Sequence, residues 1–409
     1  MDRKRVLVVG AGAAGSTAAA VLSQAAAGLD VVVVSAEDRP PYNRTTVNKG
    51  LLSGAVDDAD IALPGMELPG VTWRLGRRVT ELDAGTRTVR LDDGDRVTAD
   101  AVLLAVGADP RSLEVPDAAA HRVVTLRTAA DTARLRALLT PGAPVLVAGA
   151  GLLGAESAGV LRQAGHPVVL VDAAPTPMAA LLGSTVAGWV LQAHRQAGVD
   201  VRAGTTLREV APLDGGHLSV LLSDGTQLRP GAVVAALGVV PATGWLTGSG
   251  VPVEERAGGI PVDARQRVVG WAGVYAAGDV AAVPGPDGGP VRVEHWGAAL
   301  AQGRTAAHTA LTDLGLREPD GDAPAPELPG YGTYVHGVKL TILGWPQPVT
   351  GEVPLLGAPG DDRFAVALHD GDERLVAAVG VGGARAATRL RSLLGQRAPV
   401  SELDVSAVR

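Results

Sequence analysis

The chain carries one pattern twice: a short β-branched strand, a glycine-rich turn, a helix and a second strand. The first copy runs from Arg5 to Val34 and the second from Val145 to Val171. In each copy a Gly-x-Gly-x-x-Gly turn joins the first strand to the helix, at residues 10–15 and 149–154. This repeat predicts two βαβ units, each within a parallel sheet.

The likeness between the copies continues beyond the glycine turns. A hairpin-like turn follows in each, at Asp93-Gly94 and at Asp224-Gly225. Each copy then closes with one apolar strand, residues 101–107 in the first and 232–238 in the second. The sequence therefore predicts an α/β fold with two Rossmann-like, dinucleotide-binding domains.

The glycine spacing has a physical reason. The first glycine permits the tight turn, the second lets backbone approach a pyrophosphate, and the third lets helix and strand pack closely. An acidic residue near the end of the next strand, Glu37 or Asp172, is placed to bind a ribose hydroxyl. A carboxylate repels a 2′-phosphate, so Asp172 favours NADH over NADPH. Glu37 is less clear, because Ala36 could hold the ribose position and Glu37 could be an exposed loop residue.

Residues 40–50 have no equivalent in the second copy. An insertion confined to one of two similar domains suggests a larger cofactor there, and FAD carries a tricyclic ring that nicotinamide lacks. Arg44 is suited to a phosphate, and Lys49 to the polar edge of the ring, where positive charge stabilises reduced flavin. The alternative is that both are solvated surface cations.

Composition restricts the function classes. The 409 residues include no cysteine, so disulfides, thiolate nucleophiles and Cys-ligated metal centres are excluded. The net charge of −7 gives no reason to expect nucleic acid or an anionic membrane as partner. The uncharged run from Val6 to Leu29 imitates a signal peptide or membrane anchor, but its glycines favour a strand, turn and helix. We expect a cytoplasmic protein of two or three domains.

Several motifs resemble the NADH-dependent ferredoxin and rubredoxin reductase family, with apoptosis-inducing factor as a relative. They are residues 10–15, Pro41-Tyr42-Asn43-Arg44 through Lys49, residues 107–111, residues 149–156, residues 275–281, Glu294-His295-Trp296 and Gln302-Gly303. The resemblance implies an FAD domain (1–114 and 246–325) into which the NADH domain (115–245) is inserted. A linker from Glu318 to Gly330 then leads to a small α+β C-terminal interface domain (326–409).

The resemblance also implies site roles. Asp279 would bind the ribityl chain of FAD, Glu156 would pair with Lys49 beside the flavin, and backbone around Trp296 would contact the ring. Lys49 and Glu156 are the predicted catalytic residues. The complete predicted cofactor-binding set is Gly10, Gly12, Ala14, Gly15, Glu37, Arg44, Lys49, Val79, Gly107, Arg111, Gly278, Asp279, Glu294, His295, Trp296 and Ala299, with Gly149, Gly151, Leu153, Gly154, Glu156, Asp172 and Gly238.

Two segments depart from the family pattern. Thr45-Thr46-Val47-Asn48 stands where relatives commonly have two prolines, a leucine and a serine. Residues 330–336 lack the tryptophan that relatives carry near the flavin. The acceptor therefore stays open between a ferredoxin-type iron–sulfur protein and a small molecule, and the protein between monomer and homodimer. The alternatives are an oxidase or dehydrogenase of a small organic substrate and an NADH-sensing interaction protein. Dithiol reductases are excluded by the lack of cysteine.

Other apparent sites have simpler explanations. Residues 155–159 resemble a serine-hydrolase elbow but lack the glycine before the serine. The histidines show no metal-binding spacing, and we expect His295 to be structural or to lie behind the cofactor-contacting residues. A basic docking surface and ordinary scattered surface cations are equally compatible with a set of five residues: Arg74, Arg77, Arg78, Arg304 and Lys339.

Overall fold

The computed structural model describes residues 3–25, 29–319, 321 and 328–407. The chain divides into two compact units, each made of three segments. The first unit consists of Met1–Asn43, Ile61–Asp109 and Val240–Pro329. The second consists of Arg44–Asp60, Pro110–Val239 and Gly330–Arg409. The predicted four-part division of the chain stays a prediction.

A five-stranded parallel sheet forms the centre of the first unit. Its order is β19-β7-β1-β2-β3, with bounds Val274–Ala276, Ala101–Leu104, Lys4–Val9, Leu29–Ser35 and Val71–Leu75. The middle strands are apolar and buried along most of their length, as expected for a parallel sheet covered on both faces. Strand β19 comes from the part of the chain beyond residue 240, so the inserted topology is confirmed.

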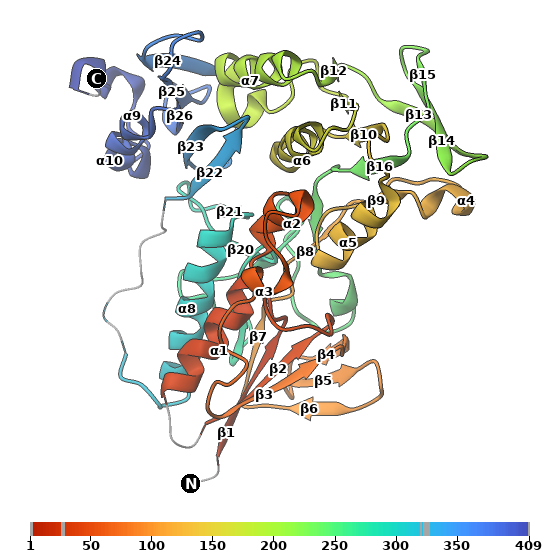
Figure 1. Ribbon diagram of the computed structural model, residues 1–409. Helices are drawn as coiled ribbons and strands as arrows, with labels where there is room; N and C mark the ends of the chain where they lie inside the picture. The colour runs from red at the N-terminus through yellow and green to blue at the C-terminus, as the bar shows by residue number, and fades with distance from the viewer. Residues whose placement is uncertain (1–2, 26–28, 320, 322–327, 408–409) are drawn as a thin grey trace. The chain divides into compact units, whose positions relative to one another are not determined.

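Two helices, α1 (Ala13–Ala25) and α8 (Trp296–Asp313), pack side by side in this unit (Figure 1). Their small residues, including Ala18, Ala306 and Ala310, are buried in one core with the strand residues Val8 and Leu103. Alanine and glycine permit close helix contact because they add little side-chain volume between the backbones. The start of each helix is therefore fixed against the sheet.

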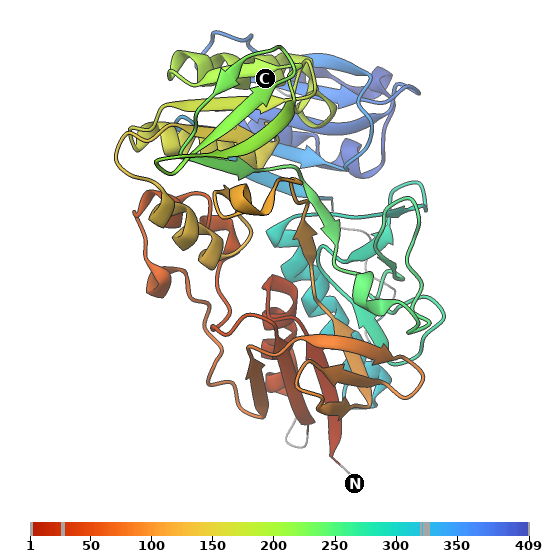
Figure 2. The ribbon, with the colours of Figure 1, turned by 90° about the vertical axis from the view of Figure 1, so that its right-hand side faces the viewer.

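Smaller sheets complete the first unit. Strands β4 (Val79–Asp83), β5 (Thr88–Leu91) and β6 (Arg96–Thr98) form an antiparallel meander, orange in Figure 2. The β5–β6 turn is the predicted hairpin at Asp93-Gly94. A second small sheet consists of β18 (Ile260–Pro261), β20 (Ala281–Pro284) and β21 (Pro290–Val291).

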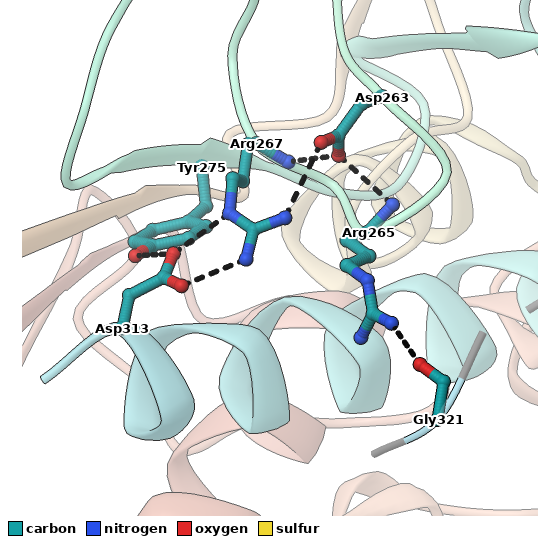
Figure 3. Close-up of polar contacts among 6 residues, drawn as sticks. All are labelled: Asp263, Arg265, Arg267, Tyr275, Asp313 and Gly321. Atoms are coloured by element: carbon teal, nitrogen blue, oxygen red, sulfur yellow. Dashed lines mark hydrogen bonds and ion pairs between the residues drawn. The ribbon is translucent and has the colours of Figure 1, made fainter. Parts of the chain in front are cut away.

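A polar cluster fixes the end of α8 (Figure 3). Asp313 accepts hydrogen bonds from the Arg267 guanidinium at 2.7 and 2.8 Å and from the Tyr275 hydroxyl at 2.8 Å. A carboxylate in the last turn faces the negative end of the helix dipole, so these donors offset an unfavourable placement. Hydrogen bonds from Arg267 hold the pKa of Asp313 below its ordinary value, and burial raises the pKa of Tyr275. The cluster ties α8 to β19.

The second unit repeats the parallel sheet of the first. The order is β12-β11-β10-β16-β9, with bounds Asp200–Ala203, Val168–Asp172, Val145–Ala148, Ala232–Ala235 and Val123–Val124. Four of the five strands correspond to strands of the first sheet. The positions of β7, β1, β2 and β3 are taken here by β16, β10, β11 and β12. The fifth strand, β9, precedes the glycine turn here, whereas β19 follows it in the first unit. The predicted duplication is confirmed.

Helices and a hairpin sheet surround this second sheet. The helices are α4 (Asp117–Ala120), α5 (Ala129–Leu138), α6 (Leu152–Gln163) and α7 (Ala179–Gln196). Strands β13 (Leu207–Leu213), β14 (His217–Leu222) and β15 (Gln227–Leu228) form the antiparallel sheet that holds the predicted turn at Asp224-Gly225. Helix α5 begins at a capping box in which Thr128 and Asp131 bind each other's backbone N–H groups.

The C-terminal residues form a five-stranded antiparallel sheet within the second unit. Its order is β22-β23-β26-β25-β24, with bounds Gly330–Val335, Val338–Gly344, Leu375–Val381, Phe364–His369 and Gly351–Leu356. Two short helices, α9 (Ala384–Arg389) and α10 (Arg391–Gly395), contact β23 and β26. This arrangement is the predicted small α+β region, and it shares a core with Leu182, Val186 and Val190 of α7.

Helix α7 is interrupted where it meets this sheet. Gly183 adopts φ 76° and ψ 164°, and a β-carbon there would lie 2.7 Å from Leu368 Cδ2. The backbone N–H groups of Ser184 and Thr185 donate to the Glu352 carboxylate, which caps the helix after the break. Although burial raises it, these hydrogen bonds hold the pKa of Glu352 below its ordinary value.

The structure decides two expectations about the chain's course. Residues 6–25 form most of β1, a glycine turn and α1, as the glycines indicated, rather than one continuous helix. Among the described residues no helix has the length and apolar character needed to cross a membrane. Part of the predicted linker, Glu318 to Gly330, lies outside the described residues.

The Asp313 cluster gives a stability prediction. We expect Asp313→Asn to lower the free energy of unfolding by about 1–2 kcal/mol at pH 7, because two strong donors lose a charged acceptor. The pKa of Asp313 is depressed by folding, so its contribution is present above the unfolded value and is lost as pH falls through the folded one. The difference from wild type should therefore shrink below about pH 4. Urea unfolding across that range measures it.

Asp95→Asn is the matched control, because it removes an exposed ion pair with Arg74 in which the aspartate side chain is 63% exposed. Its cost should be below about 0.5 kcal/mol. Equal destabilisation by the two variants would contradict the account of the cluster.

Candidate functional site

The glycine turn of the first unit leaves one position open. A β-carbon added to Gly10, whose φ is +102°, would lie 2.3 Å from Ala105 O, and one added to Gly15 would lie 1.8 Å from Gly10 O. One added to Gly12 would meet no atom of the described residues within 4 Å. The outer glycines are thus required by packing, whereas the middle glycine faces open space at the start of α1.

The second unit has the same geometry. Added β-carbons would lie 2.2 Å from Ala236 O at Gly149, whose φ is +98°, and 1.9 Å from Gly149 O at Gly154. At Gly151, the residue before α6, the part of the chain that the structure describes offers no contact within 4 Å. Each unit therefore has an open backbone at a helix N-terminus, where N–H groups and the helix dipole favour a phosphate. These cradles fit the two predicted dinucleotides.

Three other predicted residues of the first unit meet beside its glycine turn. A β-carbon on Gly278 would lie 3.3 Å from Ala14 Cβ and 3.6 Å from Ala299 Cβ. The Gly278 N–H donates to Gln302 Oε1 at 2.7 Å, which fixes the turn after β19 to helix α8. A β-carbon on Gly303 would collide with Ala14 O at 2.2 Å, so α1 and α8 are in direct backbone contact here.

The residues around this junction hold their neighbours in place. Arg292 donates to Asp279 O at 3.0 Å and to Glu294 Oε1 at 2.6 Å. His295 is the N-cap of α8, with its Nδ1 accepting from Gly297 N at 3.2 Å, and burial lowers its pKa. Trp296 begins the helix and packs against the core. His295 therefore fixes the first turn of α8, and its place in the predicted cofactor-binding set stays a prediction.

The two acidic residues differ in placement. Asp172 is the last residue of β11, and its carboxylate accepts from Ala150 N at 2.7 Å and from Ala174 N at 2.8 Å. It is thus fixed directly against the second glycine turn. Glu37 lies two residues beyond the end of β2 and accepts from the Tyr42 hydroxyl at 2.7 Å. Ser35, not Glu37, occupies the register position that corresponds to Asp172.

The predicted pair of Lys49 and Glu156 is present, with Lys49 Nζ 3.0 Å from Glu156 Oε2. Sequence reasoning missed two further partners of that carboxylate. Asn48 Nδ2 donates to Oε2 at 2.8 Å, and Thr333 Oγ1 donates to Oε1. Both residues lie in segments that depart from the family pattern, but no sequence signal indicated that the two segments meet.

The segment from Arg44 to Asp60 belongs to the second unit by its contacts. Its short helix α2 (Gly50–Ser53) follows the 3₁₀ turn η1 (Arg44–Thr46). Thr132 Oγ1 of α5 donates to Val47 O at 2.8 Å, and Arg136 Nη1 donates to Leu51 O at 3.4 Å. Although it interrupts the first copy in sequence, the segment packs against helices of the second.

The remaining predicted residues have simple positions. In the first unit Val79 is buried at the start of β4, and Gly107 follows β7 with φ +74°. In the second unit Arg111 N donates to Gly238 O at 2.9 Å, and Leu153 lies in the first turn of α6. By their contacts, the segments that contain Arg111 and Arg44 belong to the second unit.

The weaker candidates gain no support. Two of the five basic residues, Arg74 and Arg77, form ion pairs with Asp95 and Asp93 at 3.2 and 2.9 Å. This favours ordinary surface cations over a docking patch there. Ser157 lies within α6, and its hydroxyl donates to Leu153 O, which agrees with rejecting a hydrolase elbow. The described residues contain no group of three potential metal ligands.

Comparison with known proteins identifies the family. Residues 4–303 match the sequence family described as pyridine nucleotide-disulphide oxidoreductase. The chain belongs to this family. The ferredoxin–NAD(+) reductase component of the p-cumate 2,3-dioxygenase system from Pseudomonas putida is 30% identical over 98% of this chain and 95% of that protein.

Two further similarities agree with this family. Apoptosis-inducing factor 3 from Homo sapiens is 30% identical over 91% of this chain, which spans 60% of that protein. A chain from the crystal structure of the covalent putidaredoxin reductase–putidaredoxin complex is similar in fold, with a TM-score of 0.88, 24% identity and coverage of 99% of this chain and 95% of that chain. The predicted family resemblance and fold class are confirmed.

This pyridine nucleotide-disulphide oxidoreductase family member contains no cysteine, so it cannot use the disulphide chemistry that the family is named for. The prediction of an FAD-dependent oxidoreductase that uses a nicotinamide dinucleotide is confirmed at the level of the family. Its electrons must therefore pass through bound cofactors.

The glycine geometry predicts different effects of substitution within one turn. Gly151→Ala should keep the thermal stability of the cofactor-free protein but weaken NADH binding about tenfold or more, because the methyl group occupies the open space over the backbone. Gly154→Ala should destabilise the cofactor-free protein by about 1–3 kcal/mol, because its methyl group collides with Gly149 O. Thermal unfolding and titration of NADH measure these two effects.

Gly12→Ala and Gly15→Ala form the matching pair for FAD in the first unit. A loss of stability with Gly151→Ala, or normal stability with Gly154→Ala, would contradict the division between open and packed glycines.

Proposed function

We propose that the chain is an NADH-dependent reductase that binds FAD in its first unit and NADH in its second, and that it delivers electrons to a ferredoxin-type iron–sulfur protein. The observation that carries the proposal is the duplicated glycine turn, with one open backbone position in each unit. A chain with two such cradles can hold an electron donor and an electron carrier at the same time.

The first unit suits FAD because it offers more than a phosphate cradle. Besides the open position at Gly12, Gly278 lies close to Ala14 in the first turn of α1 and to Ala299, so small residues surround the start of α1. Asp279 follows directly and would bind the ribityl hydroxyls, as the family resemblance implies. Bound flavin supplies a ring that accepts a hydride and releases electrons one at a time.

The second unit suits NADH through Asp172. Its carboxylate is held beside the glycine turn by Ala150 N, so it can accept hydrogen bonds from a free ribose 2′-hydroxyl. Residues 173–180 include no lysine or arginine to neutralise a 2′-phosphate. Arg202, which lies on β12 next to β11, is already paired with Asp200 and Asp224. These charges favour NADH over NADPH.

Lys49 would provide positive charge to the flavin ring, and Glu156 would hold Lys49. The ammonium lies between Glu156 Oε2 at 3.0 Å and Thr45 O at 3.3 Å, which restricts a long and otherwise mobile side chain. No residue of the chain needs to act as a nucleophile, because the reaction depends on orientation of the two cofactors.

A ferredoxin-type acceptor is supported by the relative from Pseudomonas putida, whose name describes a ferredoxin–NAD(+) reductase component. That relative and this chain match over nearly their whole lengths. A small-molecule acceptor is the outcome expected instead if no ferredoxin accelerates reoxidation.

The test of this function is anaerobic stopped-flow absorbance of the FAD-loaded protein mixed with NADH or NADPH. We expect rapid loss of the oxidised flavin absorbance with NADH and slow loss with NADPH. Asp172→Asn should reduce the preference for NADH about tenfold or more, because it removes the charge that repels the 2′-phosphate and keeps an acceptor oxygen. A stable flavin spectrum with both nucleotides, or an unchanged preference in the variant, would contradict the proposal.

The Lys49–Glu156 pair gives a separate prediction. Lys49→Ala and Glu156→Ala should each slow flavin reduction by NADH about tenfold or more, through loss of positive charge or of its orientation. Lys4→Ala is the matched control, because Lys4 forms a comparable 3.0 Å ion pair with Asp100 on the first unit. Unchanged single-turnover rates in both variants would remove the pair from the proposed site.

A further inference from the structure

The carboxylate of Glu156 has more hydrogen-bond donors than an ion pair with Lys49 requires. Oε2 receives both Asn48 Nδ2 and Lys49 Nζ, at 2.8 and 3.0 Å, and Oε1 receives the Thr333 hydroxyl. The Glu156 side chain is only 10% exposed. Both oxygens are therefore committed to protein donors, and the plane of the carboxylate is fixed.

The two additional donors are more deeply buried than Lys49. Asn48 and Thr333 are buried, while the Lys49 side chain is 38% exposed. A buried amide or hydroxyl that lost its acceptor would leave an unsatisfied polar group, so each has a strong reason to stay on the carboxylate. The Lys49 ammonium is partly open to water, so loss of its ion pair costs less than loss of a buried hydrogen bond. The position of the carboxylate thus depends on Asn48 and Thr333 more than on Lys49.

The donors come from distant parts of the chain. Glu156 lies in the second turn of α6, Asn48 precedes α2, and Thr333 lies on β22. Helix α6 contacts both α2 and β22 (Figure 1). Strand β22 is an edge strand of the C-terminal sheet, and Thr333 is directed inward between the exposed Gly332 and Tyr334. The Thr333 hydroxyl therefore links the C-terminal sheet to the Lys49–Glu156 pair.

We propose that Asn48 and Thr333 are positioning residues that hold the Glu156 carboxylate with Oε2 toward Lys49, and so fix the charge that Lys49 presents to the flavin. The inference rests on the proposed function of the Lys49–Glu156 pair. Removal of the Thr333 hydroxyl frees Oε1, and rotation of the carboxylate then carries Oε2 away from the ammonium. Removal of the Asn48 amide leaves Oε2 without its buried donor.

The experiment compares Thr333→Val and Asn48→Leu, which keep approximate side-chain volume and remove one donor each. We expect each to slow flavin reduction by NADH about fivefold to tenfold, with an unchanged dissociation constant for NADH. The midpoint potential of the bound flavin should become more negative, because reduced flavin loses a fixed positive charge. Thr333→Ser should restore the wild-type rate and potential, since it restores the hydroxyl.

Thr341→Val is the matched control. Thr341 lies on the neighbouring strand β23, opposite Gly332, and its hydroxyl has no hydrogen-bond partner among the described residues. This variant should leave both the rate and the potential at wild-type values. If Thr333→Val lowers the thermal unfolding temperature but leaves the reduction rate and the potential unchanged, Thr333 is structural and the inference is overturned.

The outcomes separate this inference from the proposed function. Slow reduction in Lys49→Ala together with wild-type rate and potential in Thr333→Val and Asn48→Leu would overturn the positioning role and leave the function of the pair intact. Wild-type rates in Lys49→Ala and Glu156→Ala would overturn the role of the pair itself. Thermal unfolding of the cofactor-free variants shows that each comparison is made on folded protein.

Discussion

Contact between a glycine and the carbonyl oxygen of a neighbouring strand organises both units. Gly10 lies against Ala105 O and Gly149 against Ala236 O, so no side chain is possible at either position. The third glycine of each turn is pressed against the first, which holds the helix at the end of the strand. Only because these two contacts fix the turn does the middle glycine present an open backbone. The open backbone follows from packing, and the helix dipole there favours a phosphate.

The sequence predicted those features that depend on residues close together in the chain. The strands, glycine turns and helices of both copies are present, and the two parallel sheets share four of their five strand positions because the two copies carry the same pattern. The predicted Lys49–Glu156 contact also exists, although it came from a family resemblance rather than from spacing. The sequence could not place residues 44–60 with the second unit, because Thr132, Arg136 and Glu156, which bind that segment, are remote in the chain. Likewise, the sequence around Gly183 does not indicate the break in α7, because the contact that requires a glycine there comes from Leu368, which is remote in the chain.

Carboxylates on or beside helices connect distant segments throughout the molecule. Asp313 joins the end of α8 to Tyr275 and Arg267, and Glu352 joins the C-terminal sheet to the interrupted helix α7. Glu156 joins three segments at once. Each of these carboxylates is at least partly buried, so each must be paired with donors, and the donors come from whichever segments the fold brings near. In this way a few acidic groups determine which parts of the chain are held together.

The surroundings of Glu156 also bear on how far family membership defines this protein. The glycine turns and their strands, which we propose hold the cofactors, match the family pattern. The two departures from that pattern, Asn48 and Thr333, converge instead on one carboxylate. Since both residues donate to the same carboxylate, a substitution at one position changes how firmly the group that the other binds is held. The two segments that depart from the family pattern therefore meet at the predicted redox site, away from the glycine turns.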